Sequence, residues 1–229
     1  MPEKRSRTVT PDDDEKEKLL DAVLVHVPFD GWSQAALDAA LMDTGIAPAR
    51  ARVLFPRGPV DLALAYHERG DREMVKRMAA TDMTGMRYRD RIALGVRLRL
   101  EVADRELVRR GMALFSLPQY SALGTAAIWG TADRIWNALG DTSRDINWYT
   151  KRATLAAVYS ATVLFWLGDD SPGNTATRDF LDRRIDDVMK IEGLKARVRE
   201  TGLFQAFMRG PGRILDNVKA PKGNHDDAA

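Results

Sequence analysis

The residue types that most often carry catalysis or hold metals are scarce in this sequence. The chain has no cysteine, and its histidines, His26, His67 and His225, lie far apart without the spacing of paired metal ligands. No Glu-x-x-His pair is present that could hold a di-iron centre inside a helical bundle. We therefore expect no catalytic residue, no metal, no cofactor and no enzymatic activity.

Residues 168–173 read Gly-Asp-Asp-Ser-Pro-Gly and have some likeness to a phosphate-binding loop. The run lacks the lysine that should follow such a loop and the strand that should precede it. We interpret it as a turn between two helices.

A cluster of aromatic and basic residues stands near the start of one predicted helix. Trp148, Tyr149, Lys151 and Arg152 follow the polar residue Asp145. Aromatic side chains and arginine are enriched at the centres of protein interfaces, so the cluster is a candidate binding patch. The alternative is that both rings seal the core, and the spacing alone leaves both interpretations open.

The composition predicts a globular protein without a strong charge preference. Of 229 residues, 45% are hydrophobic, which suffices for a core. The formal net charge is only +2, so the overall charge does not indicate a nucleic-acid partner. The first seven residues are largely charged, where an export signal would need an apolar stretch. We therefore expect the protein to stay in the cytoplasm.

Residues 12–57 predict three short helices behind an acidic start. Ser33 can cap the second helix, Gly45 can end it, and Pro48 suits the first turn of a third helix that runs to Leu54. Three such helices make a helix-turn-helix-like unit.

The rest of the chain also shows helical periodicity and no strand-like alternation. Helices are predicted over residues 60–80, 87–110, 119–139, 146–167 and 175–191. The 146–167 segment is apolar on nearly every side, which predicts a central helix, and 175–191 is amphipathic, which predicts a peripheral one. We thus expect an all-α body over 58–192, with a flexible N-terminus at 1–11 and a disordered tail at 219–229.

Two sets of motifs carry a resemblance to known families. Leu19 to Val23, Gly31-Trp32, Leu37 to Ala40 and Phe55-Pro56 are similar to the DNA-binding head of tetracycline-repressor-type proteins. More specific are residues 145–153 (Asp-Ile-Asn-Trp-Tyr-Thr-Lys-Arg-Ala), 169–172 (Asp-Asp-Ser-Pro) and 180–187 (Phe-Leu-Asp-Arg-Arg-Ile-Asp-Asp). These resemble the signature of the ubiquinone biosynthesis protein nine family.

The resemblance implies a tetracycline-repressor-like fold adapted to lipid binding. An apolar cavity would hold an isoprenoid quinone intermediate or another lipid, and a surface patch would engage the demethoxyubiquinone hydroxylase. By the same resemblance, the patch falls on Trp148, Tyr149 and Arg152, with Lys151 in the same basic pair. The repressor-like fold also implies a homodimer, with the 175–191 helix and its neighbour forming the seam.

Candidate lipid-binding residues are large apolar side chains on the inner helices. Small residues such as Ala126, Gly130 and Ala157 on the same helices could leave volume for a cavity, although they could equally allow close helix packing. The candidates are Phe115, Leu117, Leu123, Trp129, Val163 and Trp166.

The segment 193–218 combines apolar and basic residues in the manner of an amphipathic helix that lies at a membrane surface. Its alternatives are a helix folded back on the body or docked on a partner. The residues expected to contact the membrane are Leu203, Phe204, Phe207 and Met208.

The helix-turn-helix-like unit supports an alternative function, a tetracycline-repressor-type transcriptional regulator with a hydrophobic effector. Arg50, Arg52 and Arg57 could contact DNA phosphates. The third helix lacks an evident set of Asn, Gln or Ser for base edges, and Arg52 stands where repressors usually carry tyrosine, so we expect no specific DNA binding. A purely structural scaffold for an enzyme complex is a third alternative.

Overall fold

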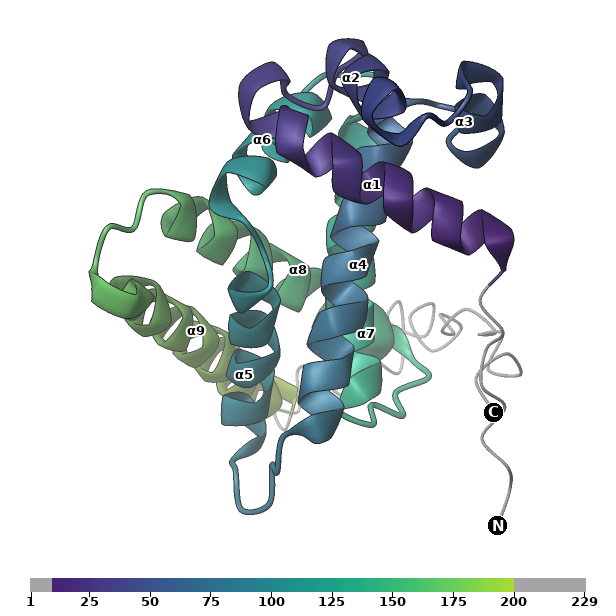
Figure 1. Cartoon of the computed structure of the whole chain (residues 1–229). Helices are drawn as coiled ribbons and strands as arrows, with labels where there is room; N and C mark the ends of the chain where they lie inside the picture. Colours follow the sequence, from purple (N-terminus) through teal and green to yellow (C-terminus); the bar gives the residue numbers. More distant parts are fainter. Residues whose placement is uncertain (1–9, 200–229) are drawn as a thin grey trace. The chain divides into compact units, whose positions relative to one another are not determined.

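The computed structural model describes residues 10–199, with side chains described up to residue 190. Within this range every regular element is helical (Figure 1), which confirms the predicted all-α fold. The elements are α1 (Pro11–Asp30), α2 (Gln34–Thr44), α3 (Pro48–Leu54), α4 (Pro59–Ala80), α5 (Tyr88–Glu101), α6 (Arg105–Phe115), α7 (Ser121–Ala138), α8 (Ile146–Leu167), the 3-10 helix η1 (Pro172–Asn174) and α9 (Thr175–Arg199).

Local capping explains several boundaries. The hydroxyl of Thr10 accepts a hydrogen bond from the backbone N–H of Asp13, whose carboxylate accepts from the N–H of Thr10 in return, and this capping box opens α1. Ser33 caps α2 as predicted, and Gly45 ends it at a φ of 69°, a left-handed conformation that glycine adopts without strain. The predicted bounds of α3 and α8 are also confirmed.

The predicted helix at 87–110 is wrong, because the chain forms two helices there. α5 ends at Glu101 and α6 begins at Arg105. The carboxylate of Asp104 accepts from the backbone N–H groups of Glu106 (2.9 Å) and Leu107 (3.0 Å), so it starts a new helix instead of continuing the old one. The turn predicted at 168–173 is confirmed and precedes α9, which continues past the predicted end at residue 191 to Arg199.

The described chain divides into two compact units. Unit 1 comprises residues 10–73 and 102–127, and unit 2 comprises 74–101 and 128–199. In unit 1, α1 packs against α2 and α6, and the core includes Leu62 and Leu107 as well as residues of the first three helices. The indole N–H of Trp32 donates to the carbonyl of Leu107 across this core (3.2 Å). The packing of the helix-turn-helix-like unit therefore extends beyond the predicted boundary at residue 57.

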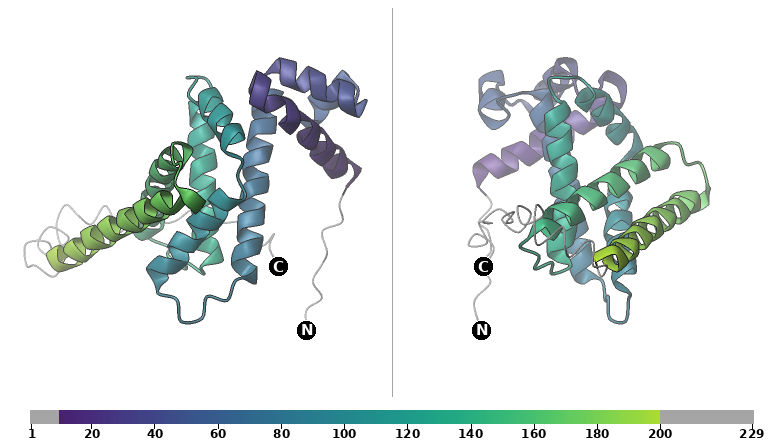
Figure 2. Two further views of the ribbon diagram at one scale, coloured as in Figure 1. Left: turned by 60° about the vertical axis from the view of Figure 1, so that its left-hand side comes forward. Right: turned by 180° about the vertical axis from the view of Figure 1, so that it is seen from behind.

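Unit 2 is built from α5, α8, α9 and parts of α4 and α7. α8 and α9 lie side by side, joined by the turn at 168–174 (Figures 1 and 2), and α5 also packs against α9. Leu181 and Ile185 of α9 are buried, as expected for an amphipathic helix. α8 is less enclosed than predicted, because Leu164 and Phe165 near its end are exposed.

Candidate functional site

The start of α8 organises the candidate site. The carboxylate of Asp145 caps the helix by accepting from the backbone N–H of Asn147 (3.0 Å), and the carbonyl of Asp145 accepts from the N–H of Trp148 (2.9 Å). With 3.6 residues per turn, Asn147, Thr150, Lys151 and Thr154 then share one face of the helix. The site is therefore set in the first two turns of α8.

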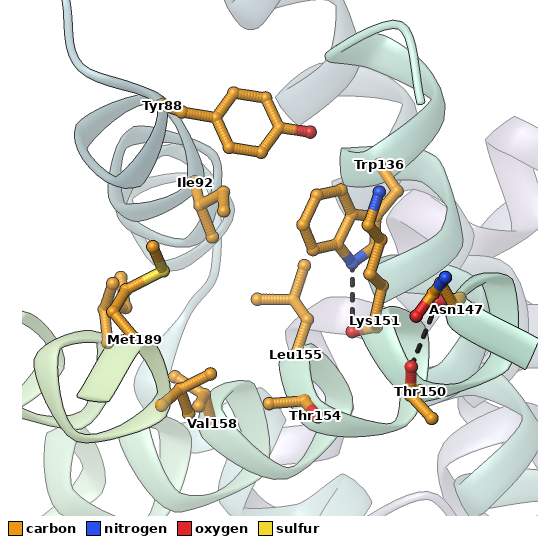
Figure 3. A pocket seen from close by; sticks show the side chains of 12 residues that line it. Tyr88, Ile92, Trp136, Asn147, Thr150, Lys151, Thr154, Leu155, Val158 and Met189 are labelled. Atoms are coloured by element: carbon orange, nitrogen blue, oxygen red, sulfur yellow. Dashed lines mark hydrogen bonds between the residues drawn. The ribbon is translucent and has the colours of Figure 1, made fainter. Parts of the chain in front are cut away.

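That face borders a cavity of about 240 Å³ within unit 2 (Figure 3). Four helices, α5, α7, α8 and α9, contribute to its wall. The lining residues are Tyr88, Ile92, Trp136, Asn147, Thr150, Lys151, Thr154, Leu155, Val158, Ile185, Val188 and Met189.

The cavity has a polar end and an apolar end. Its amide, hydroxyl and ammonium groups from α8 all belong to the run between Asn147 and Thr154, whereas Val158 and the residues from α9 are apolar. Figure 3 shows Lys151, Asn147 and Thr150 on one side of the cavity, with Met189 and Ile92 on the other. This division suits an amphiphilic ligand with a small polar head.

Lys151 is the one charged residue of the lining in the described structure. Its ammonium donates to Oδ1 of Asp141 (2.7 Å) and to Oγ of Ser143 (2.8 Å), and it lies 5.3 Å from the ring centroid of Trp136. The indole N–H of Trp136 in turn donates to the carbonyl of Lys151 (3.1 Å), as drawn in Figure 3. These contacts fix both residues at the polar end.

Tyr88 faces the same end of the cavity. Its ring centroid lies 5.9 Å from that of Trp136. Burial raises the pKa of the Tyr88 phenol, while the charge of Lys151 acts in the opposite direction. The hydroxyl is therefore neutral at physiological pH and can donate a hydrogen bond.

Arg152 points away from this group of residues into a buried polar network. Its guanidinium donates to Asp133 (2.5 Å), to Oδ2 of Asp141 (3.0 Å) and to the side chain of Asn137 (3.1 Å). The guanidinium carbon also lies 4.0 Å from the ring centroid of Trp148, a cation–π contact. The network thus fixes the position of the Trp148 ring.

Asp141 stays ionised within this network. Burial alone would raise its pKa, but hydrogen bonds from Lys151, Ser143 and Arg152 outweigh burial and lower the pKa to about 2. Both neighbouring cations therefore have a permanent counter-ion at physiological pH.

The predicted partner patch is brought together, with one correction. The rings of Trp148 and Tyr149 meet edge to face at 4.8 Å, Trp129 lies 6.0 Å from Trp148, and both patch rings are partly exposed. Arg152 is only 1% exposed. Its predicted place on the surface is wrong, because Asp133 and Asp141 draw the guanidinium inward, and any contribution to a patch is made by positioning Trp148.

The six residues predicted to bind lipid do not line the cavity. Val163 and Trp166 belong to the buried core of unit 2, and Trp129 packs on Trp148. Phe115, Leu117 and Leu123 lie in unit 1. None of the six is part of the lining of this cavity, and their role in lipid binding stays a prediction.

The lining residues that were missed had only a partial signal in the sequence. The spacing of Asn147, Thr150, Lys151 and Thr154 marks one helix face. Nothing local links that face to Tyr88, Trp136 or Met189, which the tertiary fold brings from three other helices.

A second hollow, of about 920 Å³, lies within unit 1 and is lined largely by charged side chains. Several of these charges pair with one another: Arg57 contacts Asp61 (2.6 Å) and Arg72 contacts Glu17 (2.9 Å). These charged side chains make it a less suitable site for a polyprenyl chain than the cavity of unit 2.

The arginines considered for DNA contact differ in their surroundings. Arg50 pairs with Asp12 and with Glu15 (2.5 Å), which ties α3 to α1, whereas Arg52 is exposed. Arg57 pairs with Asp61. Two of the three predicted phosphate contacts are therefore engaged within the protein.

The predicted membrane-contact residues, Leu203, Phe204, Phe207 and Met208, lie outside the described residues. Among the helices that are described, none is both long enough and apolar enough to cross a bilayer.

Comparison with known proteins identifies relatives across most of the chain. The COQ9 family model matches residues 122–192, a range that includes the aromatic patch and all of the cavity lining except Tyr88 and Ile92. Ubiquinone biosynthesis protein coq9 of Schizosaccharomyces pombe is 30% identical over 193 residues, covering 83% of this chain and 76% of the relative.

The COQ9 proteins of Drosophila melanogaster and Homo sapiens are 29% and 28% identical, covering 90% and 89% of this chain. The chain spans about two thirds of the length of each, 67% in both cases. All three relatives are named as mitochondrial ubiquinone biosynthesis proteins, which differs from the predicted cytoplasmic location.

Among solved structures, a TetR transcriptional regulator from Nitrosomonas europaea superimposes with a TM-score of 0.63 at 18% identity. The match covers 76% of this chain and 97% of the regulator. It confirms the tetracycline-repressor-like fold.

Proposed function

Since this chain belongs to the COQ9 family of ubiquinone biosynthesis proteins, we propose that it is a non-enzymatic lipid-binding protein that presents an isoprenoid quinone intermediate to the demethoxyubiquinone hydroxylase. The observation that carries this proposal is the cavity of unit 2, which is mainly apolar and has a polar end. Burying the apolar surface of a prenyl group contributes about 25 cal/mol per Å², which offsets the cost of removing the lipid from a bilayer.

The position of the aromatic patch supports presentation. Asn147 lines the polar end of the cavity, and Trp148 and Tyr149 follow it directly in the chain. A hydroxylase bound to these rings would therefore meet the cargo at its polar end. Trp and Tyr at such a position are the residue types expected at an interface centre.

Filling the cavity tests the proposal. Val158 is a buried lining residue, and Val158→Phe places a ring in the space assigned to the cargo. We expect binding of a short-tailed prenyl benzoquinone to fall at least tenfold. We also expect organic extracts of the native protein to contain an isoprenoid that extracts of the variant lack. Val53→Phe, at an exposed position in unit 1, is the matched control and should bind normally.

Thermal melting of both variants separates cavity filling from overpacking, which itself costs roughly 1–3 kcal/mol. If the native protein carried no isoprenoid and did not bind the probe, the proposed function would be wrong. If Val158→Phe bound the probe as tightly as the native protein does, the lipid site would not be this cavity.

We further propose that the protein acts as a homodimer at a membrane surface, with 193–218 as the peripheral contact. The exposed apolar residues Leu164 and Phe165 of α8, with Phe180 of α9 stacked on Phe165 at 4.5 Å, support the seam. A cargo that resides in a membrane requires the protein to reach the membrane surface.

DNA binding is the less favoured function. The repressor-like fold is its main support, and a fold shared at 18% identity carries no function with it. Arg50 is held by two carboxylates of α1, so it is not available to phosphates in this conformation. Because Arg52 is exposed, Arg52→Glu is the cleaner test, and it should leave ubiquinone output in cells unchanged.

A further inference from the structure

The ammonium of Lys151 has one hydrogen left for a ligand. A lysine ammonium carries three N–H donors. In the described structure one donates to Asp141 and one to Ser143, and the side chain is about one third exposed where it borders the cavity. The third donor therefore faces either the cavity or the solvent at its rim.

The charges around this donor cancel. Lys151 and Arg152 bring two positive charges, and Asp141 and Asp133 bring two negative charges to the same network. An anionic head such as a phosphate or carboxylate would meet no surplus of positive charge and would approach two carboxylates. A neutral oxygen acceptor needs only the single donor.

The size of the cavity limits how much of a ligand it encloses. Sites that enclose drug-sized ligands usually measure roughly 300–1,000 Å³, and this cavity measures about 240 Å³. A long polyprenyl chain does not fit within it. A substituted six-membered ring with the first part of a tail is a better match.

The apolar end of the cavity reaches solvent, as the polar end also does at Tyr88, which is 44% exposed. Met189 lines the apolar end and is 47% exposed, whereas Trp136 at the polar end is 7% exposed. Figure 3 shows the two residues on opposite sides of the cavity. A tail that starts in the cavity can therefore leave beside Met189.

We propose that Lys151 selects the head of the cargo, donating its third hydrogen to a neutral ring oxygen, a quinone carbonyl or a phenol, while the prenyl tail leaves past Met189. This inference rests on the proposed function of the cavity and adds the orientation and chemical class of the ligand. Tyr88 and Trp136 supply the aromatic wall beside the ring.

Three probes with the same short prenyl tail test the inference: a prenyl benzoquinone, a prenyl benzene without ring oxygens, and a prenyl phosphate. We expect the native full chain to prefer the quinone over the benzene about tenfold, ~1.4 kcal/mol. Lys151→Met keeps the apolar stem but lacks the donor and should abolish the preference. Lys151→Arg keeps a cation with donors and should retain most of it.

The ratio between probes is the measured quantity, because a general loss of stability lowers all three affinities together. Ser143→Ala, which removes a partner of Lys151 without removing the ammonium, is the control and should keep the preference. A preference that survives in Lys151→Met overturns the inference, and so does a native protein that favours the phosphate.

The outcomes also separate this inference from the function on which it rests. If the native protein binds the quinone and the benzene equally well, the cavity is a lipid site and only the assignment of Lys151 is wrong. If it binds none of the three probes, the lipid-binding function of the cavity is wrong as well.

Discussion

Lys151 and Arg152, neighbours in the sequence, hold opposite oxygens of the same carboxylate. The ammonium of Lys151 lies 2.7 Å from Oδ1 of Asp141, and the guanidinium of Arg152 lies 3.0 Å from Oδ2. Lys151 borders the cavity, and Arg152 lies against Trp148 of the aromatic patch. Asp141, whose side chain is 2% exposed, therefore supports both parts of the candidate site at once.

The first prediction concerns the stability of this network. Asp141→Asn leaves two cations with reduced compensation, one of them fully buried, and should lower the free energy of unfolding by about 3 kcal/mol. Asp133→Asn should cost less, because Asp133 is partly exposed and Arg152 would keep its pair with Asp141. Urea denaturation of both variants measures the difference, and an equal or reversed order would contradict the role assigned to Asp141.

The second prediction concerns acid stability. Asp141 has a pKa of about 2 in the folded protein, below its ordinary value of 3.8, so the unfolded chain takes up the proton first as the pH falls. The stabilisation is complete above about pH 5 and is lost progressively toward pH 2, on the order of 2 kcal/mol in all. Urea midpoints between pH 5 and pH 3 should fall more steeply in the native protein than in Asp141→Asn. If the urea midpoints of the two proteins fell equally with pH, Asp141 would not contribute to the loss of stability in acid.

The third prediction concerns the aromatic patch. Trp148→Lys removes an anchor of the kind that often carries ~2 kcal/mol or more at an interface centre, so hydroxylase binding should fall at least tenfold. Stability should fall modestly, since the new cation lies beside Arg152. Pull-down of the hydroxylase and thermal melting on the same variant separate the two effects, with Val53→Lys in unit 1 as the control. If Trp148→Lys still binds the hydroxylase, or loses binding only because it unfolds, the aromatic patch has no support as an interface.

The fourth prediction concerns assembly. Leu164 is 59% exposed on α8, near the stacked pair Phe165 and Phe180. In an isologous dimer each copy would bury this surface against the same surface of the other, so Leu164→Glu should yield monomers by light scattering at micromolar concentration. Met42→Glu, at an even more exposed apolar position in unit 1, should leave the mass unchanged. A native protein that is already monomeric would exclude the seam.

The sequence was sufficient for features that depend on neighbouring residues. Ser33 and Gly45 bound α2 as expected, because a capping hydroxyl and a left-handed glycine act within one turn. The bounds of α8 were predicted from its apolar pattern, and the cap that starts it, Asp145, is a local signal of the same kind. The cap at Asp104 is equally local and was overlooked within an otherwise continuous helical pattern.

Features that depend on residues far apart in the chain were not predictable in this way. The burial of Arg152 requires Asp133 and Asp141, carboxylates contributed by α7 and the loop after it, to converge on α8. The cavity requires Tyr88, Trp136 and Met189 to meet across three helices. Periodicity identifies which face of a helix is apolar, but it does not say which other helix that face meets.

The last prediction concerns the amphipathic segment at 193–218, which lies largely outside the described residues. Phe204 and Phe207 are three apart, so they would share a face of a helix, and Arg197, Arg199 and Arg209 stand nearby in the sequence. Replacing both phenylalanines with aspartate puts two charges into the layer where apolar side chains would insert, and it also repels anionic lipid. Cosedimentation with vesicles that contain anionic lipid should therefore fall at least tenfold, while the melting temperature of the helical body stays the same. Replacing the two phenylalanines with leucine is the matched control, since it keeps apolar side chains at both positions and should retain binding. If the aspartate variant sediments as the native protein does, the segment is not the membrane contact; if the melting temperature falls with binding, the segment packs on the body instead.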